Sequence, residues 1–166
     1  MAEKKQPAFR PDFKFLLAHP AHFIALGFGS GLPRKAPGTW GSLAAIPLYA
    51  VLLSFIPPLL IVALCVPAFA LGVWACEKTS QNLGVDDFGG IVIDEIVAMW
   101  LVLAVAPATW WGWLLAFALF RFFDIVKPWP IGWCDARLKG GLGVMVDDVV
   151  AALFAIVLLW AVRALM

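Results

Sequence analysis

Charged residues are scarce in this chain, and their scarcity excludes two broad classes of protein. Only 14% of the 166 residues are charged, whereas 63% are hydrophobic. Such a composition does not suit a globular domain surrounded by water, so we expect a lipid bilayer to form part of the protein's environment. The formal net charge is +1, and no run of basic residues lies along one predicted helix. The sequence therefore gives no indication of a nucleic-acid partner.

The motifs of several phosphatase classes are also absent. Cys65, Cys76 and Cys134 show neither CxxC nor Cys/His spacing, and none begins a Cys-x5-Arg motif. We therefore expect no disulfide, no zinc site and no cysteinyl-phosphate intermediate. The only histidines, His19 and His22, lie near the predicted membrane interface, which argues against a histidine nucleophile. An Asp-x-Asp-x-Thr motif and a P-loop are missing as well, so metal-assisted attack by water is the chemistry that remains.

Apolar runs of about the length that a membrane helix needs dominate the rest of the chain. The short connections at residues 56–58 and 107–109 are uncharged, whereas residues 77–95 and 127–148 are long, charged and rich in glycine. This alternation predicts two helical hairpins and a final helix, that is, an all-α polytopic membrane bundle of about five transmembrane helices. The runs are Leu43–Phe55, Leu59–Ala75, Ile96–Ala106, Trp110–Val126 and Val149–Val162.

The segment before these runs has a different character. Residues 13–32 are apolar but are interrupted by Pro20 and by three glycines, so we expect an interfacial or re-entrant helix and not a sixth crossing. Residues 1–12 form a polar tail, and the sequence has no internal repeat. We therefore expect one membrane-embedded catalytic domain over residues 13–166.

The distribution of charge predicts an orientation. If five crossings start inside, the N-terminus and both long connections lie in the cytoplasm. Eleven of the twelve basic residues are then on the inner side and only Arg163 is outside, as the positive-inside rule requires. Every acidic residue falls on the inner side too, which that rule does not require. A site that needs carboxylates is therefore expected at the cytoplasmic face of a multi-pass protein.

Five carboxylates stand where predicted helices meet that face, and they would repel one another unless they were protonated or bound a cation. Oxygen ligands without histidine or cysteine favour magnesium, manganese or calcium, and magnesium leaves positions for water and a substrate phosphate. We predict a Mg²⁺ site held by Glu95, Asp124, Asp147 and Asp148 and supported by Asp94, with Asp87 as a weaker candidate ligand.

Helix capping is the alternative explanation for these acids, because aspartate is a favoured N-cap and an acidic first turn suits the helix dipole. For Asp94 or Asp147 taken alone, capping and chemistry are both open. A cap needs only one residue, however, and two acids follow each other at both helix starts. Asp124 lies at the end of a predicted helix, where the dipole disfavours it. Capping therefore does not account for all five.

Cationic and hydroxyl side chains accompany the acids. Arg121 and Lys127 are spaced with Asp124 along one helix face, and they either neutralise acids and reach the interface or bind a phosphate. These two roles are compatible, and we predict that Arg121 and Lys127 bind the terminal phosphate of the substrate. Thr39 and Ser42 lead into the first apolar run, where they either cap that helix or bind an anion at its N-terminus, and we predict that they contact the substrate phosphate. The first, third and fifth predicted helices all start at the cytoplasmic face, so we expect three positive helix N-termini to face the acids.

Several long motifs, in the same order, resemble those of bacterial phosphatidylglycerophosphatase A. The resemblance runs from about Phe23 to Ala152, and it implies hydrolysis of phosphatidylglycerophosphate to phosphatidylglycerol and phosphate with magnesium. It also implies a place in glycerophospholipid synthesis at the inner membrane, a substrate phosphate at the cytoplasmic leaflet, and Asp94, Glu95, Asp124, Asp147 and Asp148 as the functional carboxylates. The motifs are Gly27–Gly31, Pro37–Ser42, Ile91–Glu95, Arg121–Ile131 and Gly140–Asp148.

Two other functions fit an aspartate cluster in a membrane protein. A phosphotransferase of the CDP-alcohol class places such a cluster at the inner face, although its Asp-Gly-x-x-Ala-Arg signature is absent here. A cation transporter would place its carboxylates nearer the middle of the membrane. The residues give no basis for an oligomeric state.

Overall fold

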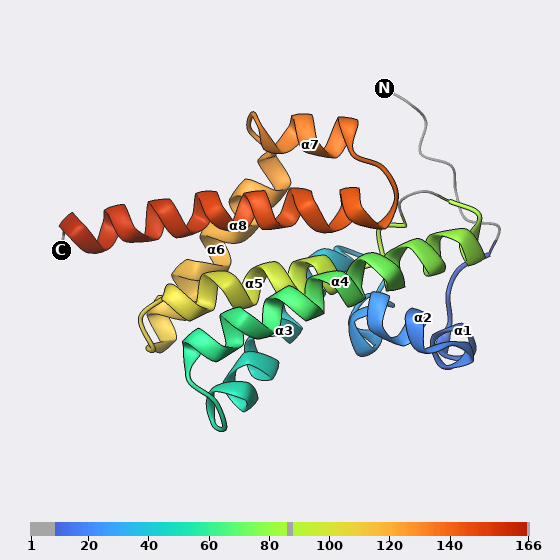
Figure 1. Cartoon of the computed structure of the whole chain (residues 1–166), viewed down its shortest axis with the longest axis horizontal. Coiled ribbons are helices and arrows are strands. Elements are labelled where there is room, and N and C mark those ends of the chain that lie inside the picture. The colour runs from blue at the N-terminus through green and yellow to red at the C-terminus, as the bar shows by residue number, and fades with distance from the viewer. Residues whose placement is uncertain (1–8, 86–87, 166) are drawn as a thin grey trace.

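The computed structural model describes residues 9–85 and 88–165, and within these ranges every regular element is a helix. The prediction of an all-α fold is therefore confirmed. Figure 1 shows long helices that pack side by side, with short helices near one end. The elements are α1 (Phe13–Ala18), α2 (Pro20–Ala25), the 3-10 turn η1 (Gly27–Gly29), α3 (Pro37–Leu53), α4 (Pro58–Leu83), α5 (Ile93–Val105), α6 (Trp110–Val126), α7 (Ile131–Arg137) and α8 (Gly140–Leu165).

Each of the five predicted apolar runs lies largely within one of the longer helices, namely α3, α4, α5, α6 and α8. Among the described residues, α4 and residues 140–164 of α8 are long and apolar enough to cross a membrane. A helix of 26 residues is about 39 Å long, which exceeds the roughly 30 Å of a bilayer's hydrocarbon core. Helix α5 has only 13 residues. Two candidate spans are therefore observed, and the five-span bundle stays a prediction.

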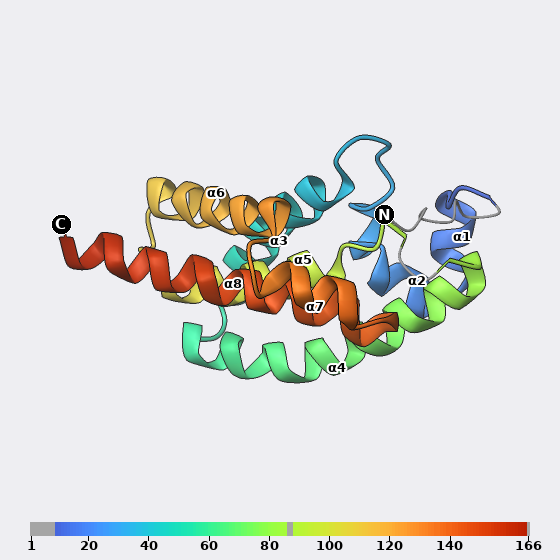
Figure 2. The same ribbon diagram turned by 90° about the horizontal axis from the view of Figure 1, so that it is seen from above.

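Helix α5 lies at the centre of the fold, in contact with α3, α4, α6 and α8 (Figures 1 and 2). Its side chains Ile96, Met99 and Leu103 are almost fully buried. Small residues let the helices around it come close together. A methyl group at Gly72 of α4 would lie 2.7 Å from the Met145 sulfur of α8. The apolar core therefore fixes α5 and α8 relative to each other, and both helices carry predicted site acids.

The predicted N-terminal interfacial helix is in fact two short helices that are broken at His19 and Pro20. Each has six residues and so spans about 9 Å, which is too short to cross a bilayer. The buried His22 ring joins them to α4, because Nδ1 lies 2.9 Å from the Phe15 carbonyl oxygen and Nε2 lies 2.8 Å from the Asn82 amide nitrogen. Both ring nitrogens are thus engaged, which agrees with the sequence argument against a histidine nucleophile.

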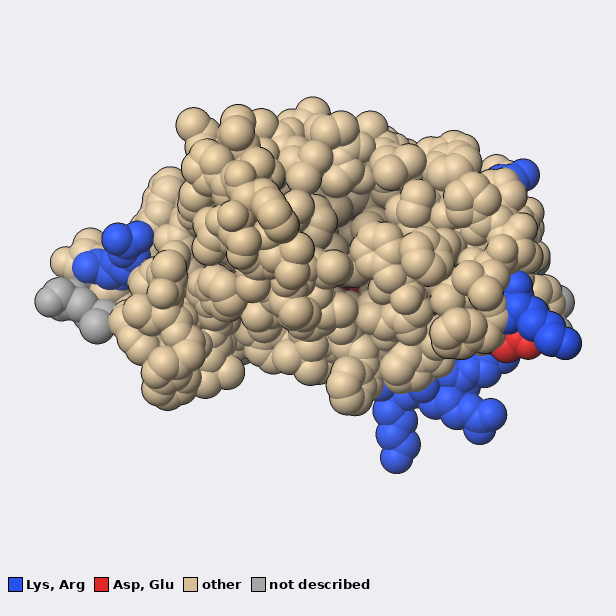
Figure 3. Space-filling view, turned by 90° about the horizontal axis from the view of Figure 1, so that it is seen from below, with Lys and Arg blue, Asp and Glu red and all other residues tan. Residues whose placement is uncertain are grey.

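Much of the apolar content lies outside the core. Phe55, Leu59 and Trp110 are 82%, 77% and 80% exposed. Figure 3 shows one face with a broad, almost uncharged band; Lys and Arg side chains gather mainly towards one end, and a smaller blue patch lies towards the other. Apolar exposure of this extent is typical of a surface that contacts a partner or a membrane.

The two long connections predicted from glycine and charge are mostly helical, which corrects the sequence interpretation. Helix α4 continues to Leu83, α7 occupies part of the second connection, and α8 begins at Gly140 instead of near Val149. Its glycines serve close packing, since a Cβ on Gly141 would lie 2.1 Å from the Val73 carbonyl oxygen of α4. Residues 147 and 148 therefore lie inside α8 and not at its start.

Candidate metal centre and phosphate site

Asp94 and Glu95 occupy the first turn of α5. The chain enters this helix from Val92, whose amide donates a 2.9 Å hydrogen bond to the Ala25 carbonyl oxygen. No side chain caps the helix, so capping does not explain either acid. Asp94 is only 8% exposed, and a carboxylate oxygen of Asp94 lies within 4.8 Å of one of Glu95. The start of α5 thus places two acids side by side in the interior.

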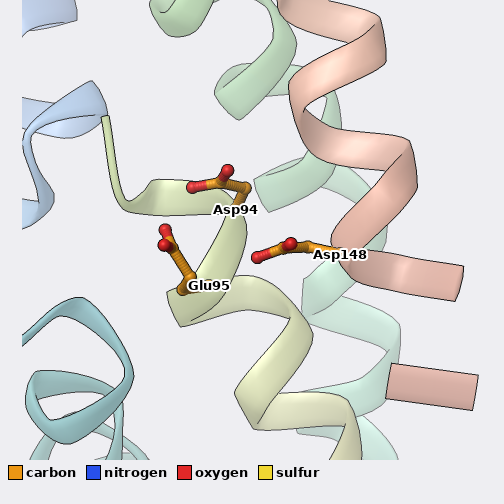
Figure 4. Close-up of side chains that lie close together, drawn as sticks. All are labelled: Asp94, Glu95 and Asp148. Carbon is orange, nitrogen blue, oxygen red and sulfur yellow. The ribbon is translucent and has the colours of Figure 1, made fainter. Parts of the chain in front are cut away.

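Asp148 of α8 completes a compact group with these two residues. Carboxylate oxygens of Asp94, Glu95 and Asp148 all lie within 4.8 Å of one another, and Figure 4 shows the three side chains reaching towards a common space from two helices. Asp148 is 3% exposed. Because it lies on the third turn of α8, helix capping is excluded as its role. The three residues form what we call the carboxylate triad.

Asp124 joins the triad from the last turns of α6. Its carboxylate pairs with Arg121 one turn earlier, and it lies close enough to Asp148 for the two carboxylates to repel each other. The Arg121 guanidinium also lies 3.8 Å from Glu95 Oε1. Arg121 therefore bridges acids of α5 and α6 at one edge of the triad.

Lys127 forms an ion pair with Asp147, the last of the five predicted acids. It ends α6 in a left-handed conformation, with φ at 45°, and its ammonium group bonds Asp147 of α8 and, at 2.8 Å, Asp135 of α7. Burial disfavours the charged form, but hydrogen bonds to the two carboxylates outweigh it and raise the pKa of Lys127 above its usual range. The side chain therefore stays cationic and fixes Asp147.

The sequence reasoning did not identify Asp135. The available signal is weak: it is the single acid between Asp124 and Asp147 in the chain. Its partnership with Lys127 depends on α7, which the proline and glycine residues of that region had concealed.

Several buried polar atoms near the triad have no hydrogen-bond partner. Such atoms are rare and costly in folded proteins, unless an ion or ligand satisfies them. Four of the six in the described part of the chain are carboxylate oxygens, and a fifth is the Arg121 Nε donor. The oxygens are Asp94 Oδ1, Glu95 Oε2, Asp147 Oδ1 and Asp148 Oδ2. A set of closely spaced oxygen ligands without nitrogen or sulfur fits a hard divalent cation such as Mg²⁺.

The start of α3 lies against Arg121 and Glu95. A Cβ on Gly38 would come within 2.1 Å of Glu95 Oε1 and 3.2 Å of an Arg121 terminal nitrogen, so only glycine leaves the carboxylate room. The buried Ser42 hydroxyl donates to the Gly38 carbonyl oxygen at 2.9 Å and accepts from Arg121 at 3.4 Å. The Thr39 hydroxyl makes no hydrogen bond to another described residue, and neither hydroxyl caps α3.

Two of the three helix N-termini predicted to face the acids do so. Those of α3 and α5 lie at the cluster. Helix α8, however, begins seven residues before Asp147, a distance of about 10 Å along its axis. Glu77 of α4 accepts a 2.9 Å hydrogen bond from the Gly141 amide there, which satisfies one of the free donors of this helix end. Asp87, the weaker candidate ligand, lies outside the described residues.

Comparison with known proteins places these residues in context. A sequence model of the family described as phosphatidylglycerophosphatase A matches residues 23–163. A phosphatidylglycerophosphatase A of Haemophilus influenzae is 49% identical over 157 residues, covering 92% of this chain and 94% of the relative. One of Escherichia coli K12 is 44% identical over 140 residues, covering 84% and 81%. A Bacteroides thetaiotaomicron protein whose name proposes a phosphatidylinositol-3-phosphatase is 40% identical over 167 aligned positions, covering 96% and 97%. No solved structure matches the chain.

Proposed function

Since the chain belongs to the phosphatidylglycerophosphatase A family and is therefore a phosphoric monoester hydrolase, we propose that it hydrolyses phosphatidylglycerophosphate in a Mg²⁺-dependent reaction. The products are phosphatidylglycerol and inorganic phosphate, and the reaction belongs to glycerophospholipid synthesis. One observation carries the magnesium proposal, namely the group of buried carboxylate oxygens that have no partner, next to an arginine with a free donor.

We assign the metal to the carboxylate triad, Asp94, Glu95 and Asp148, whose oxygens are the most closely grouped. This assignment moves Asp94 from a supporting role to a ligand. Asp124 and Asp147 each pair with a cation, so they lie at the edge of the metal site and supply additional oxygens. A bound divalent cation supplies Lewis-acid polarisation of the phosphoryl group and activation of water.

Arg121 is the proposed phosphate ligand. Its Nε donor is buried and has no partner, while its terminal nitrogen contacts Glu95 and Ser42. In this position the guanidinium would offset charge on the phosphoryl oxygens as the ester bond breaks. The start of α3, with Thr39 and Ser42, lines the same side and adds amide donors. Water adds to phosphorus, the ester oxygen leaves with a proton, and inorganic phosphate departs.

Lys127 takes a different role from the one suggested by the sequence. Two carboxylates occupy its ammonium group, so we assign it to positioning Asp147 instead of gripping phosphate. Asp147 Oδ1 remains buried and without a partner, and it is our candidate for accepting a proton from the attacking water.

The proposed setting is the bacterial inner membrane, with a multi-pass chain and the site facing the cytoplasm. The two long apolar helices and the exposed apolar side chains support membrane association. The charge pattern supports the orientation, because Arg163 donates to the Val105 carbonyl oxygen at the end of α5 opposite the acids. The substrate phosphate, on a lipid of the inner leaflet, would then reach the triad directly.

Phosphate release by the purified full chain tests the proposal. Phosphatidylglycerophosphate in detergent is offered with Mg²⁺, with EDTA, and with EDTA followed by excess Mg²⁺. We expect release only when Mg²⁺ is available and without any alcohol acceptor, which separates hydrolysis from phosphotransfer. A parallel arm with phosphatidylinositol 3-phosphate measures headgroup preference. Equal release in EDTA would refute the metal proposal. Metal flux across liposomes without lipid turnover would support the transporter alternative.

A further inference from the structure

A groove runs along the outer side of α4 where the start of α8 packs against it. It has a volume of about 470 Å³, which is within the range of pockets that hold small ligands. It shares no residue with the carboxylate triad or with the proposed phosphate ligands. We call it the α4–α8 groove, and it is lined by Ala70, Val73, Trp74, Glu77, Lys78, Gln81, Lys139, Gly141 and Leu142.

The groove changes from apolar to polar along α4. Ala70, Val73 and Trp74 line the part nearer the middle of the helix, and Leu142 of α8 faces them. Trp74 is 45% exposed and Leu142 is 49% exposed, so both present apolar surface that no other described residue covers. The polar residues begin one turn later and continue for about 6 Å towards the end of α4. Such a gradient matches the order of acyl chain and headgroup in a phospholipid.

The polar part of the groove carries two lysines, Lys78 and Lys139. Among the described residues, neither Lys78 nor Lys139 forms an ion pair. Glu77 also lines the groove, but one of its oxygens accepts from the Gly141 amide at 2.9 Å and the other from the Gln81 amide at 3.0 Å. The acid is thus engaged in holding α4 to α8, which leaves both ammonium groups available for an anion.

We propose that the α4–α8 groove binds an anionic phospholipid other than the one being hydrolysed. The lipid phosphate lies between Lys78 and Lys139, and an acyl chain follows Trp74 and Leu142 towards the middle of α4. Each lysine near an anionic lipid strengthens its binding by about fivefold, and the apolar wall adds the contribution of buried hydrocarbon. The site retains an anionic lipid beside the enzyme independently of turnover.

Native mass spectrometry of the full chain, released from detergent with added lipid, tests this site. Phosphatidylglycerol and phosphatidylcholine with identical acyl chains are titrated separately. We expect preferential retention of phosphatidylglycerol by the natural chain, a loss of about fivefold in Lys78→Gln or Lys139→Gln, and a loss of about twenty-fivefold in the double variant. Lys14→Gln, which changes an exposed lysine of α1 outside the groove, is the matched control and should bind as the natural chain does.

Two further arms make the outcome decisive. Leu142→Ser should weaken binding of the intact lipid, and glycerol 3-phosphate, which has no acyl chain, should not displace it. The double lysine variant should still release phosphate from detergent-dispersed substrate, because the groove contains no residue of the proposed metal or phosphate site. Equal retention of the two lipids by the natural chain, or unchanged retention by the folded double variant, would overturn the proposal. So would displacement by glycerol 3-phosphate at equal concentration.

Discussion

The two ends of helix α5 differ in whether their polar groups have hydrogen-bond partners. At the C-terminal end of α5, the Arg163 side chain donates a 3.3 Å hydrogen bond to the Val105 carbonyl oxygen. This carbonyl is one of the acceptors that a helix leaves without an internal partner. At its start, Asp94 and Glu95 are packed among other acids and have buried oxygens without partners. The Val105 carbonyl oxygen at the C-terminal end of α5 thus has a hydrogen-bond partner, whereas carboxylate oxygens at its N-terminal end have none.

This difference distinguishes polar groups that stabilise the fold from polar groups that serve the protein's function. Unpaired buried carboxylates destabilise a fold, so their retention at one end only indicates that a ligand satisfies them there. Arg121 and Lys127 offset part of the negative charge, but neither is bonded to Asp94 or Asp148. The centre of the cluster is therefore the part that most needs a cation.

The largest effect is expected at the centre of the cluster. Asp148→Asn should lower Mg²⁺-dependent phosphate release about a thousandfold, because it removes a charged ligand oxygen while keeping the size of the side chain. At the edge of the cluster, Asp124→Asn should lower activity by a similar factor, since that carboxylate anchors Arg121. Both variants should elute as the natural chain does in size-exclusion chromatography.

Asp12→Asn is the matched control for these substitutions. Asp12 caps α1 by accepting a 2.9 Å hydrogen bond from the Phe15 amide, and asparagine caps a helix equally well. The control should retain full activity. Full activity in the folded Asp148→Asn protein would contradict the assignment of the cluster as the catalytic site.

The next effect concerns the contact between α3 and Glu95. Gly38→Ala places a methyl group 2.1 Å from Glu95 Oε1, so the carboxylate or α3 must shift. A displacement of about 1 Å at a reacting group reduces rate by up to roughly a hundredfold. Gly89→Ala, where the added Cβ meets no atom within 4 Å, should change little. Equal activity of the two variants in the phosphate-release assay would show that Glu95 need not be held in place.

A smaller effect is expected for the cation that positions Asp147. Lys127→Gln should reduce kcat about tenfold with little change in KM, as is typical when a partner of a functional carboxylate is lost. Lys127→Arg, which keeps the charge, should recover part of the loss. A rise in KM with kcat unchanged would instead return Lys127 to a role in binding the substrate phosphate.

The smallest effect on activity is expected at the C-terminal end of α5, where the Val105 carbonyl oxygen has a hydrogen-bond partner. Arg163→Gln should change phosphate release by less than about twofold, because an exposed carbonyl oxygen can bond to water or to the new amide. Thermal unfolding of Arg163→Gln and of Asp148→Asn, both in detergent, compares the contributions of the two ends of α5 to stability. Removing the charge at Asp148 should raise or preserve the melting temperature in metal-free buffer. A large loss of activity in Arg163→Gln would show that the two ends are not independent.

The positions of the long helices could be predicted from the sequence because they depend on apolar runs alone. In the structure Asp94, Glu95 and Asp148 are grouped closely, whereas Asp124 and Asp147 each pair with a cation; their shared role at one site stays a prediction. The start of α8 could not be predicted in this way. Gly140, Gly141 and Gly143 are typical of a loop, and the close packing of Gly140 and Gly141 against Glu77 and Val73 of α4 becomes visible only in the fold.

The sequence alone also could not predict most partners of individual side chains. Spacing on α6 placed Arg121 beside Asp124, as observed. It could not place Arg121 beside Ser42 or Lys127 beside Asp135, because those contacts depend on how α3 and α7 pack against the bundle. Local spacing therefore predicted pairs within one helix, whereas pairs between helices required the fold.

Mn²⁺, a paramagnetic substitute for Mg²⁺, reports on metal binding by the carboxylate triad. Electron paramagnetic resonance of the full chain in detergent, titrated with Mn²⁺, measures the free and bound ion without turnover. We expect Mn²⁺ binding that Mg²⁺ displaces and that Asp94→Asn and Asp148→Asn each weaken strongly, while Asp12→Asn leaves it unchanged. Undiminished binding in the folded Asp94→Asn/Asp148→Asn double variant, or no binding by the natural chain, would contradict this expectation.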